Sequence, residues 1–412
     1  MKIAVLTLGC KVNKYESDAL IFTLQKKGFE ATDALEWADA YIINTCAVTN
    51  EAERKSRQMI ERCRKFNPSA KIYVVGCASQ NRPSQFEKKG VVFVQGVAEK
   101  LKIIDHLLSE GEKVYDLPLE YEDDFFSAQT KERAFIKIQD GCNNFCTYCI
   151  IPYLRGRSRS REAKSVIAEI EKLPKSVKEV VLVGIDVSSY CDKNGTKLID
   201  LLEALDRFGF RLRLSSMEDN LISEDFVRRL KKLKNFCPHF HLSLQSGCDE
   251  VLKKMNRKYR TADFERTVNL IRKYFPLAGI TTDVIVGFPT ETEENFTETV
   301  NFIKKIGFSD LHIFPYSNRK GTVASKMFKD LPKSVKEERA KVLAEIRKKD
   351  KIDFITKNDI LEVLIEEEKN GVFFGYSKNY IKCAFVGGCN VGEIVRARVI
   401  KPSLSASICE RV

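Results

Sequence analysis

Histidine, tryptophan and long apolar runs are scarce in this sequence. Its 412 residues include only 4 histidines and 1 tryptophan, and so few imidazoles argue against a His-rich zinc site. No apolar run approaches the roughly 20 residues of a membrane helix. The opening, MKIAVLTLGCKVNKYES, is too short in its apolar part for a signal peptide and lacks a small-residue cleavage site. The sequence therefore predicts a cytoplasmic protein with no membrane partner.

Positive charge and cysteine, by contrast, are plentiful. The formal net charge is +12, which favours a polyanionic partner such as nucleic acid, although a positively biased surface is the simpler alternative. In a reducing compartment, the 13 cysteines are ligands, catalysts or core residues more often than disulfides. The length and a hydrophobic content of 43% indicate two or three domains.

Strands and helices alternate in the first stretch, which predicts an open parallel sheet. Three expected strands, Lys2–Cys10, Ala40–Cys46 and Lys71–Cys77, each end in a cysteine. The carboxyl ends of parallel strands face one crevice, where ligands bind. We therefore expect Cys10, Cys46 and Cys77 to converge on a shared ligand. The alternative is three separately buried cysteines, since free cysteine is often buried.

A second strand–helix series follows an acidic, irregular segment, Leu117–Arg133, that reads as a linker. Six strands are expected, beginning near Phe135, Glu179, Arg211, His239, Ile280 and Asp310. Six units make a barrel short of the usual eight. In HFHLSLQ (His239–Gln245), polar and apolar side chains alternate, so the polar face can line a lumen with room for a cofactor.

The texture changes again after Lys351, where short alternating strands and glycine-containing turns predict a small all-β barrel. The fold class is therefore α/β multidomain. We expect an N-terminal open parallel α/β sheet over residues 1–120, a central partial (β/α)6 barrel over 133–350 and the C-terminal barrel over 352–412.

The most specific motif is GCNNFCTYC, in which Cys142, Cys146 and Cys149 follow the first barrel strand with C-x3-C-x2-C spacing. A matching second pair for a zinc site is absent. With Tyr148 as the aromatic residue, the motif resembles the signature of the radical S-adenosylmethionine (SAM) superfamily. The resemblance implies that three thiolates hold a [4Fe–4S] cluster whose fourth iron binds SAM, from which an electron generates a 5′-deoxyadenosyl radical.

The N-terminal motifs TLGCKVNKYES, INTCAVTN and VVGC resemble the N-terminal domain of radical SAM methylthiotransferases. The resemblance implies a second, auxiliary [4Fe–4S] cluster on Cys10, Cys46 and Cys77 that carries the sulfur to be inserted. Two SAM molecules are then used, one as methyl donor and one as radical source. A flavodoxin-like or ferredoxin-like electron donor and a sulfur donor are implied partners.

The assignment to a substrate branch of the family depends on less specific motifs. IQDGCNNFCTYCIIPYLRGRSRSR, RLRLSSMED and HLSLQSG resemble the branch that converts N6-threonylcarbamoyladenosine at position 37 of tRNA, beside the anticodon, to its 2-methylthio derivative. The C-terminal barrel resembles the RNA-binding TRAM domain. The alternatives are a methylthiotransferase for isopentenyladenosine tRNA or for a small-subunit ribosomal protein, and a non-catalytic RNA-binding iron–sulfur protein.

Further site residues are expected near these motifs. Family strands that contact SAM point, besides Tyr148, to Gly184, Asp186, Ser243, Gln245, Ile285 and Gly287. The alternately spaced Arg155, Arg157, Arg159 and Arg161 are expected to share one face of an extended segment and to contact phosphates of the tRNA anticodon stem-loop. A solvated charge run, or ion pairing with acidic neighbours, is the alternative. The basic helix with Arg54, Lys55, Arg57, Arg62 and Lys65 allows the same two interpretations.

Overall fold

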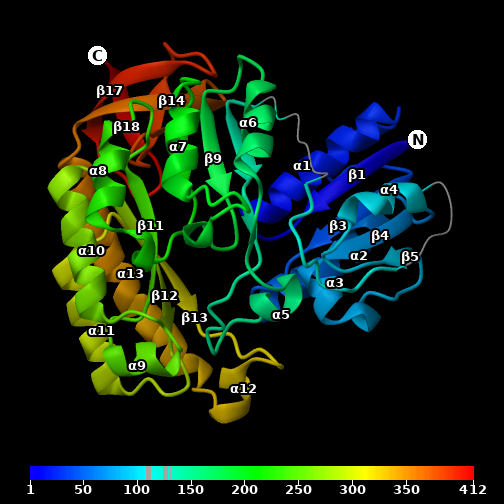
Figure 1. The fold of residues 1–412 in the computed structure, drawn as a ribbon, viewed down its shortest axis with the longest axis horizontal. Helices are drawn as coiled ribbons and strands as arrows, with labels where there is room; N and C mark the ends of the chain where they lie inside the picture. Colours follow the sequence, from blue (N-terminus) through cyan, green and yellow to red (C-terminus); the bar gives the residue numbers. More distant parts are fainter. Residues whose placement is uncertain (108–112, 124–128, 130) are drawn as a thin grey trace.

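A computed structural model describes residues 1–107, 113–123, 129 and 131–412. Along the chain, an N-terminal parallel sheet is followed by a central strand–helix series and a C-terminal β-barrel (Figure 1). Residues 124–128 and 130 of the expected linker Leu117–Arg133 lie outside the described part. Within that part, no helix has the length and apolarity of a membrane span.

The N-terminal section is a five-stranded parallel sheet of order β2-β1-β3-β4-β5. Its elements are β1 (Lys2–Thr7), α1 (Lys11–Lys26), β2 (Glu30–Thr32), β3 (Ala40–Thr45), α2 (Asn50–Phe66), β4 (Lys71–Gly76), α3 (Cys77–Asn81), β5 (Val91–Val94) and α4 (Ile103–His106). Both faces of the sheet are buried in separate apolar clusters. The strands β1, β3 and β4 are direct neighbours, so their carboxyl ends adjoin.

The central section contains the six expected strands as two parallel sheets, β10-β9-β6 and β11-β12-β13. Isolated bridges, such as Met217 to Leu242, link the two sheets, and one apolar cluster lies between the strands and their helices. The strands are β6 (Arg133–Lys137), β9 (Glu179–Val183), β10 (Arg211–Leu214), β11 (His239–Gln245), β12 (Gly279–Val286) and β13 (Asp310–Pro315).

Helices and two short strands complete this section. The helices are α5 (Ile151–Arg155), α6 (Ala163–Glu171), α7 (Leu198–Asp206), α8 (Glu224–Lys232), α9 (Asp249–Lys254), α10 (Thr261–Tyr274), α11 (Glu293–Ile306), α12 (Val323–Met327) and α13 (Lys333–Thr356). The strands β7 (Gln139–Asp140) and β8 (Arg159–Ser160) form a small antiparallel pair that the sequence did not indicate.

The C-terminal section is a closed barrel of order β14-β15-β16-β18-β17. Its strands are β14 (Ile360–Lys369), β15 (Val372–Ser377), β16 (Lys382–Val386), β17 (Ile394–Lys401) and β18 (Ser407–Arg411). Helix α13 continues to Thr356 before the barrel starts at Ile360. The barrel therefore begins a few residues after Lys351, where the sequence changes from a helical pattern to short alternating strands.

Candidate functional site

A single cavity of about 810 Å³ runs between the three sections. All six candidate cysteines line it, three from the N-terminal section and three from the central one. The convergence expected from the strand ends is therefore present, and the two trios face a common space.

Three neighbouring strands position the N-terminal trio. Cys10 precedes α1, Cys46 follows β3, and Cys77 begins α3 immediately after β4. Gly9 has a φ of +107°, and a Cβ at this position would lie 2.8 Å from Sγ of Cys46. Only glycine lets the loop after β1 approach Cys46 this closely.

The second trio lies on the loop that follows β7. Gly141, with a φ of +70°, starts the loop, and a Cβ there would lie 2.0 Å from the carbonyl oxygen of Arg157. The amide of Asn144 donates to Sγ of Cys142 at 3.4 Å. From a distant loop, the Asn256 side chain donates to the carbonyl oxygens of Asn144 and Phe145. The loop is thus held from both sides.

Each trio has an arginine directed at one of its sulfurs. Nε of Arg155 donates to Sγ of Cys77 at 3.3 Å, and Nη1 of Arg257 donates to Sγ of Cys146 at 3.4 Å. Arg257 also pairs with Glu218. Arg257 was not singled out from the sequence, because only the fold brings it to a cysteine 111 residues away.

The cavity is a poor environment for free thiolates. Burial raises the pKa values of Cys46, Cys142 and Cys149 to about 12. Without a metal, these side chains are therefore neutral thiols at physiological pH. Coordination to iron would deprotonate them, and the nearby guanidinium groups would stabilise the resulting negative charge.

Most of the expected cofactor-binding residues line the same cavity. The set comprises Tyr148, Gly184, Asp186, Ser243 and Gln245. Asp186 accepts a hydrogen bond from the Asn144 side chain at 3.3 Å, which ties it to the cysteine loop. Gln245 has a φ of +65°, a conformation uncommon for residues other than glycine.

Ile285 and Gly287 are not part of the cavity lining. Ile285 packs against an apolar cluster. The amide of Gly287 donates to Glu291 at 2.6 Å, and a Cβ at Gly287 would lie 2.4 Å from Cγ of Lys336. The end of β12 therefore turns away from the cavity.

The expectation that four arginines share one exposed face is wrong. The side chains of Arg155 and Arg161 are each 1% exposed, and that of Arg159 is 8% exposed. Arg155 ends a helix instead of continuing an extended segment. Of the four, Arg157 is exposed, and its guanidinium lies over the ring of Phe145.

Carboxylates from other parts of the chain explain this burial. Arg155 hydrogen-bonds to Glu16 and Asp140, each at 3.0 Å, and to Asn13 at 2.7 Å. Arg159 pairs with Asp140. Arg161 pairs with Glu169 and, at 2.6 Å, with Asp123. Ion pairing with acidic neighbours, the alternative interpretation of the run, is therefore correct for these three residues.

The C-terminal barrel contributes Asn379, Tyr380, Ile381 and Lys382 to the lining of the cavity. Buried Arg213 binds Glu179 at 2.7 Å and donates to the barrel carbonyls of Ser377 and Lys378. Although burial opposes ionisation, Arg213 and Arg133 lower the pKa of Glu179 to about 2. The ionised, buried Glu179 thus holds Arg213 and Arg133 in place, and these arginines contact the barrel.

A second, basic groove lies beside helix α2. It has a volume of about 580 Å³, and its lining includes Arg57, Arg82, Lys320 and Lys326. Arg57 belongs to the basic helix singled out from the sequence. Glu53 in the same groove pairs with Arg319 at 2.9 Å.

Fold and thiol loop together define a radical SAM protein. A family model described as the radical SAM superfamily matches residues 136–303, and one described as uncharacterized protein family UPF0004 matches residues 2–96. The radical SAM methyltransferase TsrM from Kitasatospora setae, solved with tryptophan and a SAM analogue, has a TM-score of 0.55 at 16% identity, covering 79% of this chain and 75% of that chain. That likeness concerns the fold.

Sequence relatives narrow the class. Proteins named threonylcarbamoyladenosine tRNA methylthiotransferase MtaB from Bacillus subtilis (strain 168) and Aquifex aeolicus (strain VF5) are each 39% identical, over 97% of this chain and over 94% and 100% of their own lengths. A tRNA-2-methylthio-N(6)-dimethylallyladenosine synthase of Thermoanaerobacter sp. (strain X514) is 35% identical, over 87% of this chain and 81% of that protein. The chain belongs to the radical SAM methylthiotransferase family and is an enzyme of the transferase class.

Proposed function

We propose that the protein methylthiolates C2 of N6-threonylcarbamoyladenosine at position 37 of tRNA. The single observation that carries this proposal is the shared cavity, onto which both cysteine trios open. A reaction that needs a radical source and a sulfur source on one substrate carbon requires such proximity. The names of the two 39% identical relatives favour this nucleoside over isopentenyladenosine.

Two [4Fe–4S] clusters are proposed, one on Cys10, Cys46 and Cys77 and one on Cys142, Cys146 and Cys149. Each trio supplies three thiols, the ligand that iron–sulfur clusters take, and leaves one iron for an external ligand. With SAM bound, the second cluster would supply the 5′-deoxyadenosyl radical, and the first would supply the sulfur that a second SAM methylates.

The remaining lining residues are proposed to bind and orient. Asp186 and Gln245 offer oxygen and amide groups to the polar end of SAM, and Ser243 offers a hydroxyl. Tyr148, within the cysteine loop, packs against an apolar cluster and is proposed to limit the entry of water. Arg155 and Arg257 are proposed to hold Cys77 and Cys146 in position and to offset thiolate charge.

We further propose three domains, residues 1–120, 133–350 and 352–412, with the six central strands forming a partial (β/α)6 barrel and the last domain being TRAM-like. The anticodon stem-loop is proposed to contact the C-terminal barrel, Arg157 and the groove with Arg57 and Lys320. The exposed cations Arg157 and Lys320 suit a phosphate backbone. A flavodoxin-like or ferredoxin-like reductant and a sulfur donor would complete the system, in the cytoplasm.

Mass spectrometry of tRNA nucleosides from cells that lack the gene tests the substrate. We expect 2-methylthio-N6-threonylcarbamoyladenosine to disappear while its unmodified precursor accumulates. An unchanged peak would exclude this substrate, and a change confined to the isopentenyladenosine derivative or to ribosomal protein would select one of the alternatives.

A second assay separates an enzyme from a non-catalytic RNA-binding protein. The cluster-loaded protein is incubated with SAM and a strong reductant, and 5′-deoxyadenosine is measured. Wild type should form it, and the Cys149→Ala variant should not. Absence of the product from wild type with intact clusters would refute the catalytic proposal.

A further inference from the structure

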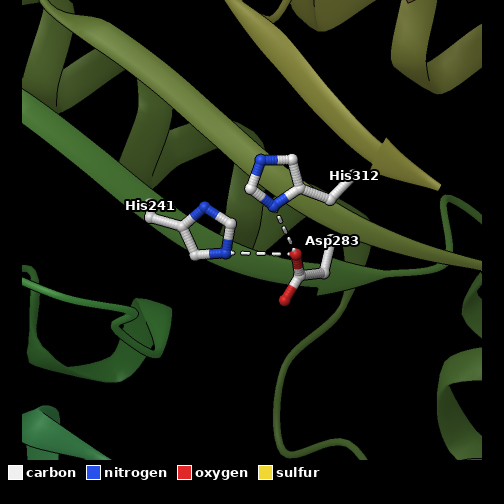
Figure 2. A group of neighbouring side chains, drawn as sticks. All are labelled: His241, Asp283 and His312. Atoms are coloured by element: carbon white, nitrogen blue, oxygen red, sulfur yellow. Dashed lines mark hydrogen bonds and ion pairs between the residues drawn. The ribbon is translucent and has the colours of Figure 1, made fainter. Parts of the chain in front are cut away.

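A third group of ligand-type side chains lies on the cavity wall, apart from the cysteines. His241, Asp283 and His312 come from the neighbouring parallel strands β11, β12 and β13, and they point toward one another (Figure 2). Asp283 and His312 are direct partners in the strand register. Their ligand atoms all lie within 4.8 Å of one another. Because sheet strands hold all three, the spacing is fixed by backbone pairing.

The distances suit one metal ion. Nε2 of His241 and Nδ1 of His312 each lie 3.2 Å from Oδ1 of Asp283. Metal–ligand bonds of about 2.1 Å place neighbouring ligand atoms about 3.0–3.4 Å apart at right to tetrahedral angles. Figure 2 shows the other oxygen of Asp283 directed away from both rings, and Asp283 is one of the residues that line the cavity.

An outer partner fixes the orientation of one imidazole. Nδ1 of His241 lies 2.9 Å from the hydroxyl of Thr281. If this nitrogen carries the proton, Nε2 presents its lone pair toward Asp283. Metal-bound histidines usually have such a partner on the second nitrogen, which sets the tautomer and the ring plane.

We propose that His241, Asp283 and His312 bind one divalent first-row transition-metal ion, in addition to the iron held by the cysteines. Two imidazoles and one carboxylate are a ligand set of such ions, with further positions left open. The side chains are 10%, 26% and 52% exposed, and all three line the cavity, so the open positions would be accessible from it. There an oxygen-bearing group of a bound molecule would complete the coordination. This inference rests on geometry and does not depend on the proposed reaction.

Manganese(II) is a suitable probe, because thiolate ligands select softer metals. The tag-free, cluster-loaded protein in its oxidised, EPR-silent state would be titrated with Mn²⁺, and free Mn²⁺ measured by EPR. Electron spin echo modulation would then detect nitrogen coupled to the bound ion. We expect uptake of one ion with imidazole nitrogen coupling. Asp283→Asn should weaken binding by at least about tenfold, the loss that removal of even an outer partner causes.

His312→Asn provides an independent variant, since the half-exposed side chain can be replaced with little risk to folding. It should reduce both uptake and nitrogen coupling. His106→Gln removes a histidine of the N-terminal section and is the matched control, which should bind as wild type does. Equal uptake and equal nitrogen coupling in wild type and His312→Asn would overturn the proposal, and so would the absence of nitrogen coupling in wild type.

Discussion

Replacing Arg155 with methionine tests whether this residue joins the N-terminal section to the central section, which carries the second cysteine trio. Its guanidinium is buried and binds Asn13, Glu16, Asp140 and the sulfur of Cys77. Asn13, Glu16 and Cys77 lie in the N-terminal section, whereas Arg155 itself follows the second cysteine trio. Methionine keeps much of the length of the side chain and removes the charge.

The expected loss of folding stability depends on the partners that Glu16 and Asp140 keep in the variant. Removing one member of a buried ion pair costs about 3–5 kcal/mol when the other charge is left alone. Here Glu16 keeps Lys100 and Lys137, and Asp140 keeps Lys137 and Arg159. We therefore expect the low end, about 3 kcal/mol, or roughly a hundredfold in the unfolding equilibrium.

Two measurements check this prediction. Trp37 is the only tryptophan and lies in the N-terminal section, so its fluorescence follows denaturant unfolding of that section. Iron and sulfide content with spectroscopy reports which cluster is lost, and we expect the auxiliary one. Arg157→Met is the matched control, since an exposed site should change stability by less than about 0.5 kcal/mol. A loss below about 1 kcal/mol for Arg155→Met, or equal loss of both clusters, would refute the reasoning.

Three further predictions concern the clusters, the RNA and acid stability. Cys77→Ala and Cys149→Ala should each lose about half of the iron and sulfide if each trio holds its own cluster, as proposed. Complete loss in either variant would contradict separate sites. Lys320→Glu should reduce the salt dependence of tRNA binding by about 0.7–0.9 in log–log slope, whereas Lys305→Glu, on helix α11, should not; equal slopes for wild type and Lys320→Glu would exclude the groove. Because the folded-state pKa of Glu179 is about 2 against an ordinary 4.5, its ionised form stabilises the fold above pH 4.5, and this contribution is lost as pH falls toward 2. Acid titrations should show that the stability of Glu179→Gln depends less on pH within that window than the stability of wild type does. Identical curves would show that Glu179 does not stabilise the contact with the barrel.

The sequence predicted the positions of the cysteines better than the roles of the arginines. Cys10, Cys46 and Cys77 could be placed together because parallel strands share one edge for their carboxyl ends, and the hydrophobic runs that mark the strands are local. The alternation in His239–Gln245 likewise predicted which side chains line the cavity. Both inferences need only periodicity and the direction of a strand.

The arginine run required knowledge that no local pattern contains. Arg155 and Arg161 resemble surface cations in sequence, and the carboxylates that bury them lie on helix α1 and helix α6. The same limit applied to Arg257, whose partner sulfur is set by packing of a distant loop. The charge of a side chain can be read from the sequence. Whether that side chain is buried, and which charged groups surround it, depends on the tertiary structure.

The buried charges around Arg155 have a consequence for the auxiliary trio. The group contains the cations Arg155, Lys100, Lys137 and Arg159 and the carboxylates Glu16 and Asp140. Among the described ion-paired residues of this group, four cations therefore face two carboxylates, at a depth where screening by solvent is weak. Neutral thiols do not need such a surplus, whereas three thiolates on a cluster would be stabilised by it. The charge balance of the group thus favours the ligated state of Cys77 and its neighbours over the free thiols.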